Sequence, residues 1–439
     1  MKRKRISMIL AASVLCAALT ACGGSSSTGD QSSADAKAAD AGSGGTILKW
    51  AVWDIAKTPY YQPLIDAFEK EHPEVKVELV DLGSSDYMTV LATQLSGSGS
   101  DFDVVTIKDV PGYATLVNKG VLEPLDERIA KDNIDLTMYG GLSDQVKVSG
   151  KLYELPFRSD RWVIYYNKDI FDKAGVPYPG NDMTWKEYDE LARRLTDTTA
   201  GQEVYGAHYH TWRSTVQLDG ILDGEHSIVD GSYDFTKPYY DMVLAEQKDG
   251  VCMDYATLKT QNLHYSDAFA QGNVAMMNMG SWFISTLIEK VKSGEYSSCA
   301  NWGMVKYPHA EGAEPGSTLA TITALGVPVS APHKDLAWEF VKFVSGEKGA
   351  KIMAASGNIP AATDETIVDL IAGMEGFPKD DTSRDALIVT HAYLEMPVNE
   401  KSSEIEAALN EGHDLIMTES VTIDEGIKQM NEAVQAVLK

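Results

Sequence analysis

The feature that most constrains the fold of this chain is an alternation of strand and helix patterns in its first hundred residues. Residues 47–53 form an apolar, strand-like run, residues 61–71 carry apolar side chains at helical spacing, and residues 75–80 alternate as a strand does. A strand, a helix and a strand in succession are typical of a parallel sheet with crossover helices. The sequence therefore predicts an α/β fold rather than an all-helical one.

The same pattern continues along the chain. Strand-like runs recur at residues 103–107 and 162–166, and helices are predicted at residues 185–195 and 336–344. Near the C-terminus, apolar residues repeat at spacings of 3, 4 and 3, which predicts a last amphipathic helix with the buried stripe Ile427, Met430, Val434 and Val437.

The N-terminus has the composition of an export signal. Four basic residues at positions 2–5 precede an apolar run at residues 6–18. That run is shorter than the roughly 20 residues needed to span a bilayer. It ends in Leu19-Thr20-Ala21-Cys22, which resembles the lipobox of bacterial lipoproteins. The resemblance implies a signal peptide over residues 1–21 and lipid on Cys22; a plain secretory signal with a chance cysteine is the alternative.

Residues 22–45 are expected to form a flexible linker. After Cys22 this segment is rich in Gly, Ser, Ala, Thr and Asp and has no aromatic residue. A flexible coil of this length spans roughly 25 to 30 Å between its ends. Such a linker favours a Gram-positive cell surface over a periplasm as the location of the anchored protein.

The size and charge of the remaining chain limit its function. About 390 residues are too many for one hydrophobic core, so two lobes are expected. The formal net charge is −26, and it becomes more negative without the four basic residues of the signal. Nucleic acids and anionic ligands are therefore poor candidates as partners.

Two cysteines remain in the folded part, Cys252 and Cys299. An exported protein could oxidise them to a disulfide, but two cysteines this far apart in sequence are equally consistent with buried thiols. The sequence leaves both possibilities open.

Several segments together resemble the maltose-binding-protein type of extracellular solute-binding protein, the family-1 receptors of ABC importers. The segments occur in the order of that family, from residue 50 to about residue 360, and comprise residues 68–77, 150–157, 165–171, 184–188, 269–277, 280–282, 337–343 and 357–360. Each segment is a loose match alone, and their order makes the resemblance specific.

The resemblance implies two α/β lobes of discontinuous chain, joined by crossing strands that act as a hinge, with the ligand held in the cleft between them. The lobes would comprise residues 46–157 with 301–350 and residues 158–300 with 351–439. By this resemblance the protein is expected to capture a carbohydrate, with an oligosaccharide as the expected ligand, by hinge closure and to deliver it to the transmembrane permease subunits of an ABC importer. It would act as a monomer without a cofactor, and not as an enzyme.

The resemblance also indicates ligand-binding residues. Trp282 follows the Gly280-Ser281 turn where the family places a stacking tryptophan, although it could instead pack a helix start. Asp160 aligns with a hydroxyl-binding carboxylate of the family, and it could equally be an ion-pair partner of a flanking arginine such as Arg158. Further aromatic contacts of the family fall near Tyr209, His210 and Trp212.

Polar and aromatic residues at predicted strand ends add candidates, because α/β proteins place ligands there. A sugar needs flat aromatic faces together with hydrogen-bonding groups at its edges. The residues that meet this description are Trp53, Asp54, Ser85, Asp86 and Asp109. Each could instead be an ordinary loop residue or a helix cap.

One departure from the family limits the choice of sugar. The late stacking tryptophan expected after Asn358-Ile359-Pro360 is absent, because this segment continues with Ala361-Ala362-Thr363. The departure puts a maltodextrin ligand in doubt.

Two rival functions remain. A secreted carbohydrate-active enzyme is possible in principle, but the sequence has no Gly-x-Ser-x-Gly, His-Glu-x-x-His, Walker or Cys-x-x-Cys motif. A receptor for a metal or another non-sugar solute is suggested only by the Tyr165-Tyr166 and Tyr239-Tyr240 pairs and by His208 with His210. No third ligand of suitable spacing accompanies them, so no metal site is predicted.

Overall fold

The computed structural model describes residues 45–83, 86–97, 100–201, 203–310, 313 and 315–439. The expected signal peptide, Cys22, most of the linker, and Ser85 lie outside the described residues. No helix within the described part combines the length and the apolar character that crossing a bilayer requires.

The first part of the sheet is parallel, as the sequence predicts. Strand β1 (Thr46–Val52) pairs in parallel with β2 (Val75–Asp81) and with β3 (Val104–Ile107). All four residues of β3 are buried, which fits a strand covered by helices on both faces. The prediction of an α/β fold is confirmed for this region.

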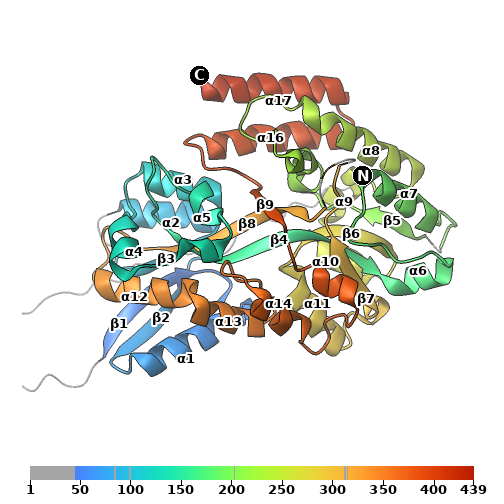
Figure 1. Cartoon of the computed structure of the whole chain (residues 1–439). Helices are drawn as coiled ribbons and strands as arrows, with labels where there is room; N and C mark the ends of the chain where they lie inside the picture. The colour runs from blue at the N-terminus through green and yellow to red at the C-terminus, as the bar shows by residue number, and fades with distance from the viewer. Residues whose placement is uncertain (1–44, 84–85, 98–99, 202, 311–312, 314) are drawn as a thin grey trace, which may run out of the picture. The chain divides into compact units, whose positions relative to one another are not determined.

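Helix α1 (Tyr61–Glu71) connects β1 to β2 and has the predicted bounds. Its buried residues Tyr61, Leu64, Ile65 and Phe68 follow helical spacing, and Pro73 comes two residues after its end. The other helices around β1 to β3 are α2 (Tyr87–Ser96), α3 (Val110–Asn118), α4 (Asp126–Asp132), α5 (Leu142–Gln145), α12 (Lys334–Ser345) and α13 (Glu347–Ala355) (Figure 1).

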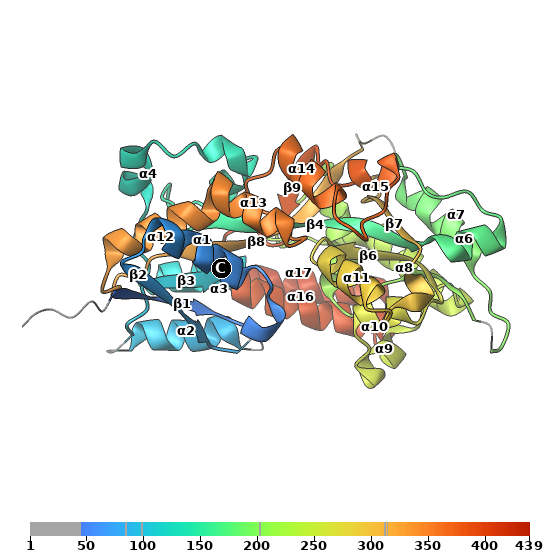
Figure 2. The same ribbon diagram turned by 90° about the horizontal axis from the view of Figure 1, so that it is seen from below.

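Two long strands connect this region to the rest of the chain. The first half of β4 (Leu155–Asn167) pairs antiparallel with β8 (Ser317–Gly326), which in turn pairs with β3. The second half of β4 pairs antiparallel with β6 (Val274–Gly280) and β7 (Trp302–Lys306). Seen from below, β4 and β8 run between β1 to β3 and β6 to β7 (Figure 2).

A short strand brings a distant segment to the same place. Strand β9 (His391–Leu394) pairs in parallel with β8, with Ser317 opposite His391 and Ala320 opposite Leu394. The chain that follows β9 therefore lies beside the strands that join the two lobes. This position makes residues 395 and onward candidates for the interlobe site.

The second lobe is built around β6. Strand β5 (Tyr205–His208) pairs with it in parallel, and all seven residues of β6 are buried. The helices of this region are α6 (Lys168–Ala174), α7 (Trp185–Leu195), α8 (Lys237–Asp249), α9 (Tyr255–Gln261), α10 (Tyr265–Ala270), α11 (Phe283–Lys292), α14 (Glu365–Ala372), α15 (Asp381–Asp385), α16 (Ser402–Met417) and α17 (Ile423–Leu438).

Several helix ends are determined locally. Helix α7 starts at a capping box, in which the Thr184 hydroxyl accepts from the Glu187 N–H and the Glu187 carboxylate accepts from the Thr184 N–H. Short 3-10 helices complete the described chain at η1 (Ile55–Lys57), η2 (Leu136–Tyr139), η3 (Arg213–Thr215), η4 (Gln217–Asp223), η5 (Asp234–Thr236) and η6 (Ser297–Cys299).

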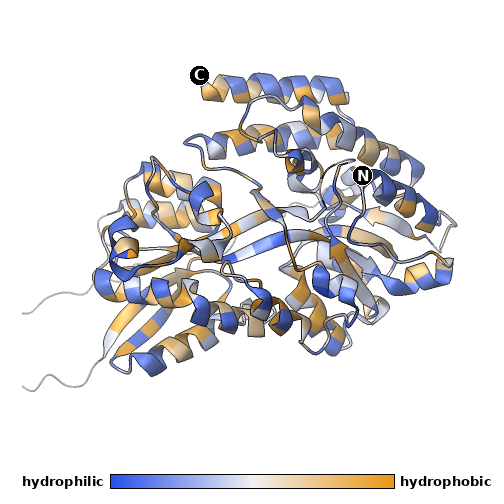
Figure 3. Cartoon of the chain, viewed as in Figure 1, coloured by the Kyte–Doolittle hydropathy of each residue, from blue (hydrophilic) through white to orange (hydrophobic). Residues whose placement is uncertain are grey.

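The C-terminal helices α16 and α17 are amphipathic, and apolar and polar residues alternate along both (Figure 3). Ile427, Met430 and Val434 are buried as predicted, whereas Val437, near the end of α17, is only half-buried. Helix α16 also reaches the first lobe: the Ser403 hydroxyl donates to the Pro111 carbonyl at 3.4 Å, near the start of α3. The two lobes therefore touch beside the strands that join them.

The positions of the two cysteines decide between a disulfide and buried thiols. Cys252 and Cys299 are both buried and both free. Each packs in a different cluster of buried apolar side chains, and no disulfide links them.

Candidate functional site

Three tryptophans from separate segments meet at a cavity of about 560 Å³. Trp162 lies on β4, Trp212 precedes η3, and Trp282 follows β6 at the start of α11. The ring centroids of Trp162 and Trp282 are 5.8 Å apart, and those of Trp282 and Trp212 are 6.1 Å apart. Trp212 has 39% of its surface exposed, so aromatic surface is available to a ligand in this cavity.

Polar side chains form the rest of the wall. The Lys259 ammonium lies 3.2 Å from the Asp414 carboxylate, and the Arg213 guanidinium lies 3.4 Å from Glu406. The other polar residues of the lining are Thr211, Ser214, Thr321, Glu395, Asn410 and His413. Aromatic faces next to hydroxyl, amide and carboxylate groups suit a polyhydroxylated ligand.

A second cavity of about 150 Å³ adjoins the first. The two cavities share Arg213, Thr321, Glu395 and Glu406. The smaller one also contacts the first lobe through the segment from Lys108 to Pro111, at the end of β3 and the start of α3. The two adjoining cavities together have walls from both lobes.

Glu395 occupies the junction of the two cavities. Its Oε1 accepts a hydrogen bond from the Trp162 indole N–H. Burial raises the pKa of Glu395 to about 7, while the Trp162 bond and the Arg213 charge oppose that rise and the charges of Glu406 and Asp160 add to it. Glu395 therefore changes its charge near neutral pH.

The histidines at this site are neutral near pH 7. Burial lowers the pKa of His413 to about 3 and that of His210, with a further contribution from His264, to about 4. Near neutral pH, both rings therefore act as hydrogen-bonding or packing groups without charge.

The structure brings together some of the residues predicted from the sequence. Trp282 and Trp212 line the larger cavity and Asp109 lines the smaller one. Asp109 also caps α3, since its Oδ1 accepts from the Gly112 N–H at 2.7 Å. His210 supports the aromatic wall, because its ring packs edge-on against Trp212 with centroids 4.6 Å apart.

Asp160 and Arg158 lie on β4 and form the ion pair that was one of the two alternatives considered from the sequence. Asp160 is 1% exposed, its Oδ2 lies 2.9 Å from Arg158 Nε, and its Oδ1 accepts from the Ser281 hydroxyl at 3.0 Å. Neither residue is among the described residues that line the two cavities. The contact with Ser281 positions the residue that precedes Trp282.

The strand-end candidates of the first lobe are spread out. Trp53 is mostly buried and packs on Tyr87 with centroids 4.9 Å apart, and the Lys108 ammonium lies 5.3 Å from the centroid of a Trp53 ring. Asp54 has a left-handed backbone with φ of 49° at the start of η1. Asp86 is exposed before α2, and Ser85 lies outside the described residues.

Tyr209 is 3% exposed and belongs to the apolar core of the second lobe. Its ring packs against Tyr188 with centroids 6.4 Å apart. It does not belong to the described lining of either cavity, and it packs in the core of the second lobe.

Sequence reasoning missed the polar half of the site. Arg213 directly follows Trp212, and this proximity is a signal that could have identified it. Glu395 had no comparable signal, because it follows strand β9, which is only four residues long and pairs with β8, more than 60 residues away in the chain. Glu406 and Asp414 lie on α16, beyond the segments that resemble the family.

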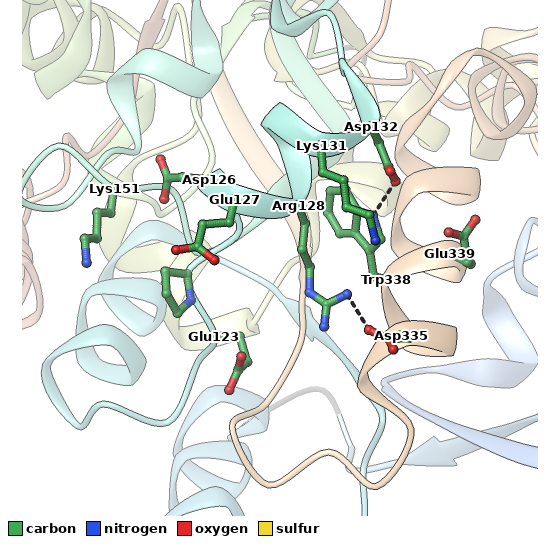
Figure 4. A pocket seen from close by; sticks show the side chains of 11 residues that line it. Glu123, Asp126, Glu127, Arg128, Lys131, Asp132, Lys151, Asp335, Trp338 and Glu339 are labelled. Carbon is green, nitrogen blue, oxygen red and sulfur yellow. Dashed lines mark hydrogen bonds and ion pairs between the residues drawn. The ribbon is translucent and has the colours of Figure 1, made fainter.

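A larger cavity of about 950 Å³ lies elsewhere, between α4 and α12. Two of its carboxylates are engaged: Asp335 pairs with Arg128 at 2.9 Å, and Asp132 accepts from the Trp338 indole N–H at 2.7 Å (Figure 4). Trp338 is its one aromatic residue among the described lining and is 3% exposed. This cavity offers a sugar little stacking surface.

The tyrosines that suggested a metal have other partners. The Tyr165 hydroxyl donates to the Gly280 carbonyl at 3.0 Å, and the Tyr240 hydroxyl lies 2.9 Å from His413 Nδ1. Within the described residues, no three His, Cys, Asp or Glu side chains are grouped as metal ligands would be.

Comparison with known proteins gives a consistent result. The chain is 27% identical over 315 residues to a mannitol-binding protein of Pseudomonas aeruginosa, covering 69% of this chain and 70% of that one. It is 24% identical over 364 residues to a galactooligosaccharide-binding protein of Bacillus subtilis, covering 79% and 78% respectively.

Solved structures agree. A sugar transporter of Rhizobium etli in an open conformation is 52% identical, with a TM-score of 0.83 and coverage of 89% of this chain and 100% of that one. An ABC substrate-binding protein of Listeria monocytogenes in complex with cycloalternan has the same fold, with a TM-score of 0.75, 22% identity, and coverage of 90% and 99%. The two-lobed α/β fold is thereby confirmed.

The profile of one family matches residues 53–351 of this chain. The match covers more than half of the chain. The chain belongs to the bacterial extracellular solute-binding protein family.

Proposed function

We propose that this protein is the carbohydrate receptor of an ABC importer. It binds a neutral sugar or polyol outside the cytoplasm, closes around it, and presents it to the permease subunits without altering it. The observation that carries the proposal is the aromatic corner of Trp162, Trp212 and Trp282, which opens onto acidic and amide groups at the meeting of the two lobes. The names of the relatives, which include mannitol and galactooligosaccharide binders, support a carbohydrate.

Each residue has a specific role in this proposal. Trp282 and Trp212 stack on the apolar faces of the sugar, and Asp109 accepts from a hydroxyl at the edge contributed by the first lobe. Asp160, Arg158 and His210 act indirectly by positioning Ser281 and Trp212. Ligand roles for Trp53, Asp54, Ser85, Asp86 and Tyr209 remain predictions.

The lobe bounds also remain a proposal, with two adjustments that the contacts favour. Strand β7 pairs with the second half of β4, so we place residues 302–306 in the second lobe. Helix α13 spans the predicted boundary at residue 350 and contacts α1, so we keep it whole in the first lobe. The remaining bounds stay as predicted from the sequence.

Retention at the membrane forms part of the same proposal. A receptor outside the cell is useful to an importer only if it stays nearby, and lipid on Cys22 with a flexible linker would hold the folded body within reach of the permease. We further propose that the protein acts as a monomer, and that the membrane is that of a Gram-positive cell. Release of the protein by a Cys22→Ser substitution would support the anchor.

A thermal-shift screen tests the ligand proposal. Residues 45–439 are heated with sugars, polyols, amino acids and divalent metals; a ligand present at 100 times its dissociation constant adds about 2.7 kcal/mol to the stability of the folded state. We expect a rise in Tm with a sugar or polyol, which is recovered unchanged. A rise only with metals or amino acids, or turnover of the sugar, would contradict the proposal.

Substitution of the stacking residue completes the test. Trp282→Ala should abolish the sugar-induced shift while the protein without sugar still unfolds cooperatively. Tyr178→Ala is the matched control, because Tyr178 is an aromatic residue that is 45% exposed outside the described lining of both cavities. Unchanged sugar affinity in Trp282→Ala would remove this residue from the site.

A further inference from the structure

The junction between the two cavities is the most acidic part of the site. Glu395 and Glu406 line both cavities together with Arg213 and Thr321. A ligand that extends from the aromatic corner towards Asp109 must therefore pass both glutamates. Their chemistry determines which ligands the site accepts.

Glu395 is held in place from two directions. Its backbone N–H donates to the Ala320 carbonyl at 3.1 Å, which continues the pairing of β9 with β8. Its carboxylate accepts from the Trp162 indole, and the Trp162 carbonyl in turn accepts from the Thr318 hydroxyl at 2.6 Å. A group fixed in this way loses little freedom on binding a ligand.

Arg213 is one cation beside two carboxylates, so it offsets only part of this acidity. Its Nη2 lies 3.4 Å from Glu406, and it is 5% exposed. Within the described structure, its Nε and Nη1 are buried and lack hydrogen-bond partners. One guanidinium therefore acts on two carboxylates: it contacts Glu406, and its charge also acts on Glu395.

Over both cavities as well, carboxylates outnumber cations. The cationic side chains of the lining are Arg213, Lys259 and Lys108, and four carboxylates accompany them. Lys259 is engaged by Asp414 at 3.2 Å, and Lys108 lies over the Trp53 ring. The carboxylates of the two cavities are Asp109, Glu395, Glu406 and Asp414.

We propose that Glu395 is a specificity-determining residue of this site. It accepts a hydrogen bond from a hydroxyl of an uncharged sugar or polyol, and together with Glu406 it excludes sugars that carry a phosphate or a carboxylate. This inference rests on the proposed function, and it names the ligand class of the same site.

The physical basis is the difference between a hydroxyl and an anion at a carboxylate. A hydroxyl can donate to Glu395, and a hydrogen bond to a charged acceptor in a partly buried site is stronger than one to a neutral acceptor. An anionic substituent has no proton to donate and meets like charge from two glutamates. The site therefore discriminates between ligands by their charge.

Calorimetric titration of residues 45–439 with matched pairs of probes tests this proposal. The pairs are mannitol with mannitol 1-phosphate, glucose with glucose 6-phosphate, and galactobiose with digalacturonic acid, all at pH 8 where Glu395 is ionised. The neutral member of a pair that binds should bind at least about tenfold more tightly than its acidic counterpart. Equal or tighter binding of an acidic member would overturn the proposal.

Variants assign the selectivity to its residue. Glu395→Gln should weaken binding of the neutral probe by about tenfold to a hundredfold at pH 8. It should also reduce the difference in affinity between the neutral and the acidic probe. Glu411→Gln is the control, since Glu411 lies exposed on α16, outside the described lining of both cavities. If Glu395→Gln leaves both the affinity for the neutral probe and the difference in affinity between the two probes unchanged, the proposal is overturned.

The dependence of sugar affinity on pH is a second readout, and it would not change if Glu395 had only a structural role. Affinity for the neutral probe should rise from pH 6 to pH 8 in the natural chain and stay flat in Glu395→Gln. The groups that face Glu395 or share its cavities are Trp162, Asp160, Arg213, Glu406, Asp109, Lys108, Lys259, His413 and Asp414. A rise that persists in the variant would assign the titration to one of these and overturn the role of Glu395.

A measurement without ligand separates this proposal from the proposed function. With 5-fluorotryptophan incorporated, the ¹⁹F resonance that disappears in Trp162→Phe should shift with a midpoint near pH 7, and Glu395→Gln should abolish that shift. If no sugar in the screen binds, the proposed function fails, and this titration alone decides whether Glu395 ionises in the cleft. A Trp162 resonance that does not respond to pH would overturn the proposal.

Discussion

Replacement of Glu395 by glutamine should change how the stability of the protein depends on pH. The pKa of Glu395 is about 7 in the folded protein against an ordinary value of 4.5. The folded state therefore holds a proton that the unfolded state releases, so this stabilising contribution is complete below about pH 4.5 and is lost as the pH rises through 7. The shift corresponds to at most about 3 kcal/mol.

Urea unfolding of residues 45–439 at pH 5, 6, 7 and 8 measures this contribution. The glutamine side chain can still accept from the Trp162 indole but cannot ionise. Relative to the natural chain, the free energy of unfolding of Glu395→Gln should rise progressively by up to about 3 kcal/mol between pH 5 and pH 8. Glu411→Gln, which removes an exposed carboxylate from α16, should run parallel to the natural chain.

Parallel profiles for Glu395→Gln and the natural chain would refute the reasoning. They would mean that Glu395 has an ordinary pKa and that its carboxylate is hydrated rather than enclosed between Trp162, Arg213 and Glu406. A difference that grows towards low pH would refute it as well, because the sign of the linkage would then be that of a stabilised carboxylate.

Two further predictions concern the scaffold. Gly206→Ala should destabilise the protein by about 2 kcal/mol or more, since a Cβ there would lie 1.9 Å from the Ala192 carbonyl oxygen; Gly180→Ala, with no described atom within 4 Å of its Cβ, should change the stability by less than about 0.5 kcal/mol in the same melts. Equal effects would contradict the packing of β5 on α7. Cys252 and Cys299 should both react with a thiol reagent, but only after unfolding and without prior reduction; a requirement for reductant would indicate a disulfide.

Much of the scaffold could be predicted because its signals are local. Helices α1 and α7 have the predicted bounds, since Pro73 follows one and the Thr184 capping box starts the other. Strand β4 was predicted only over residues 162–166, whereas it extends over Leu155–Asn167. Its first half contains Arg158 and Asp160, which are polar and yet paired with each other, so it lacks the apolar pattern of a buried strand.

The site was predicted in part for the same reason. Trp282 and Trp212 belong to segments that resemble a known family, and aromatic residues beside turns by themselves indicate a sugar-binding surface. Glu395 has neither signal, because its role depends on the pairing of β9 with β8 and on the indole of Trp162, 233 residues away in sequence. Contacts this remote in the chain leave no periodicity in a single sequence.

The most direct test of the account is a crystal structure of residues 45–439 with the sugar or polyol that raises Tm most. We expect an unmodified sugar between the two lobes, with an apolar face against Trp282 or Trp212 and a hydroxyl within hydrogen-bonding distance of Glu395. A sugar bound instead in the cavity between α4 and α12, or found cleaved in the cleft, would contradict it.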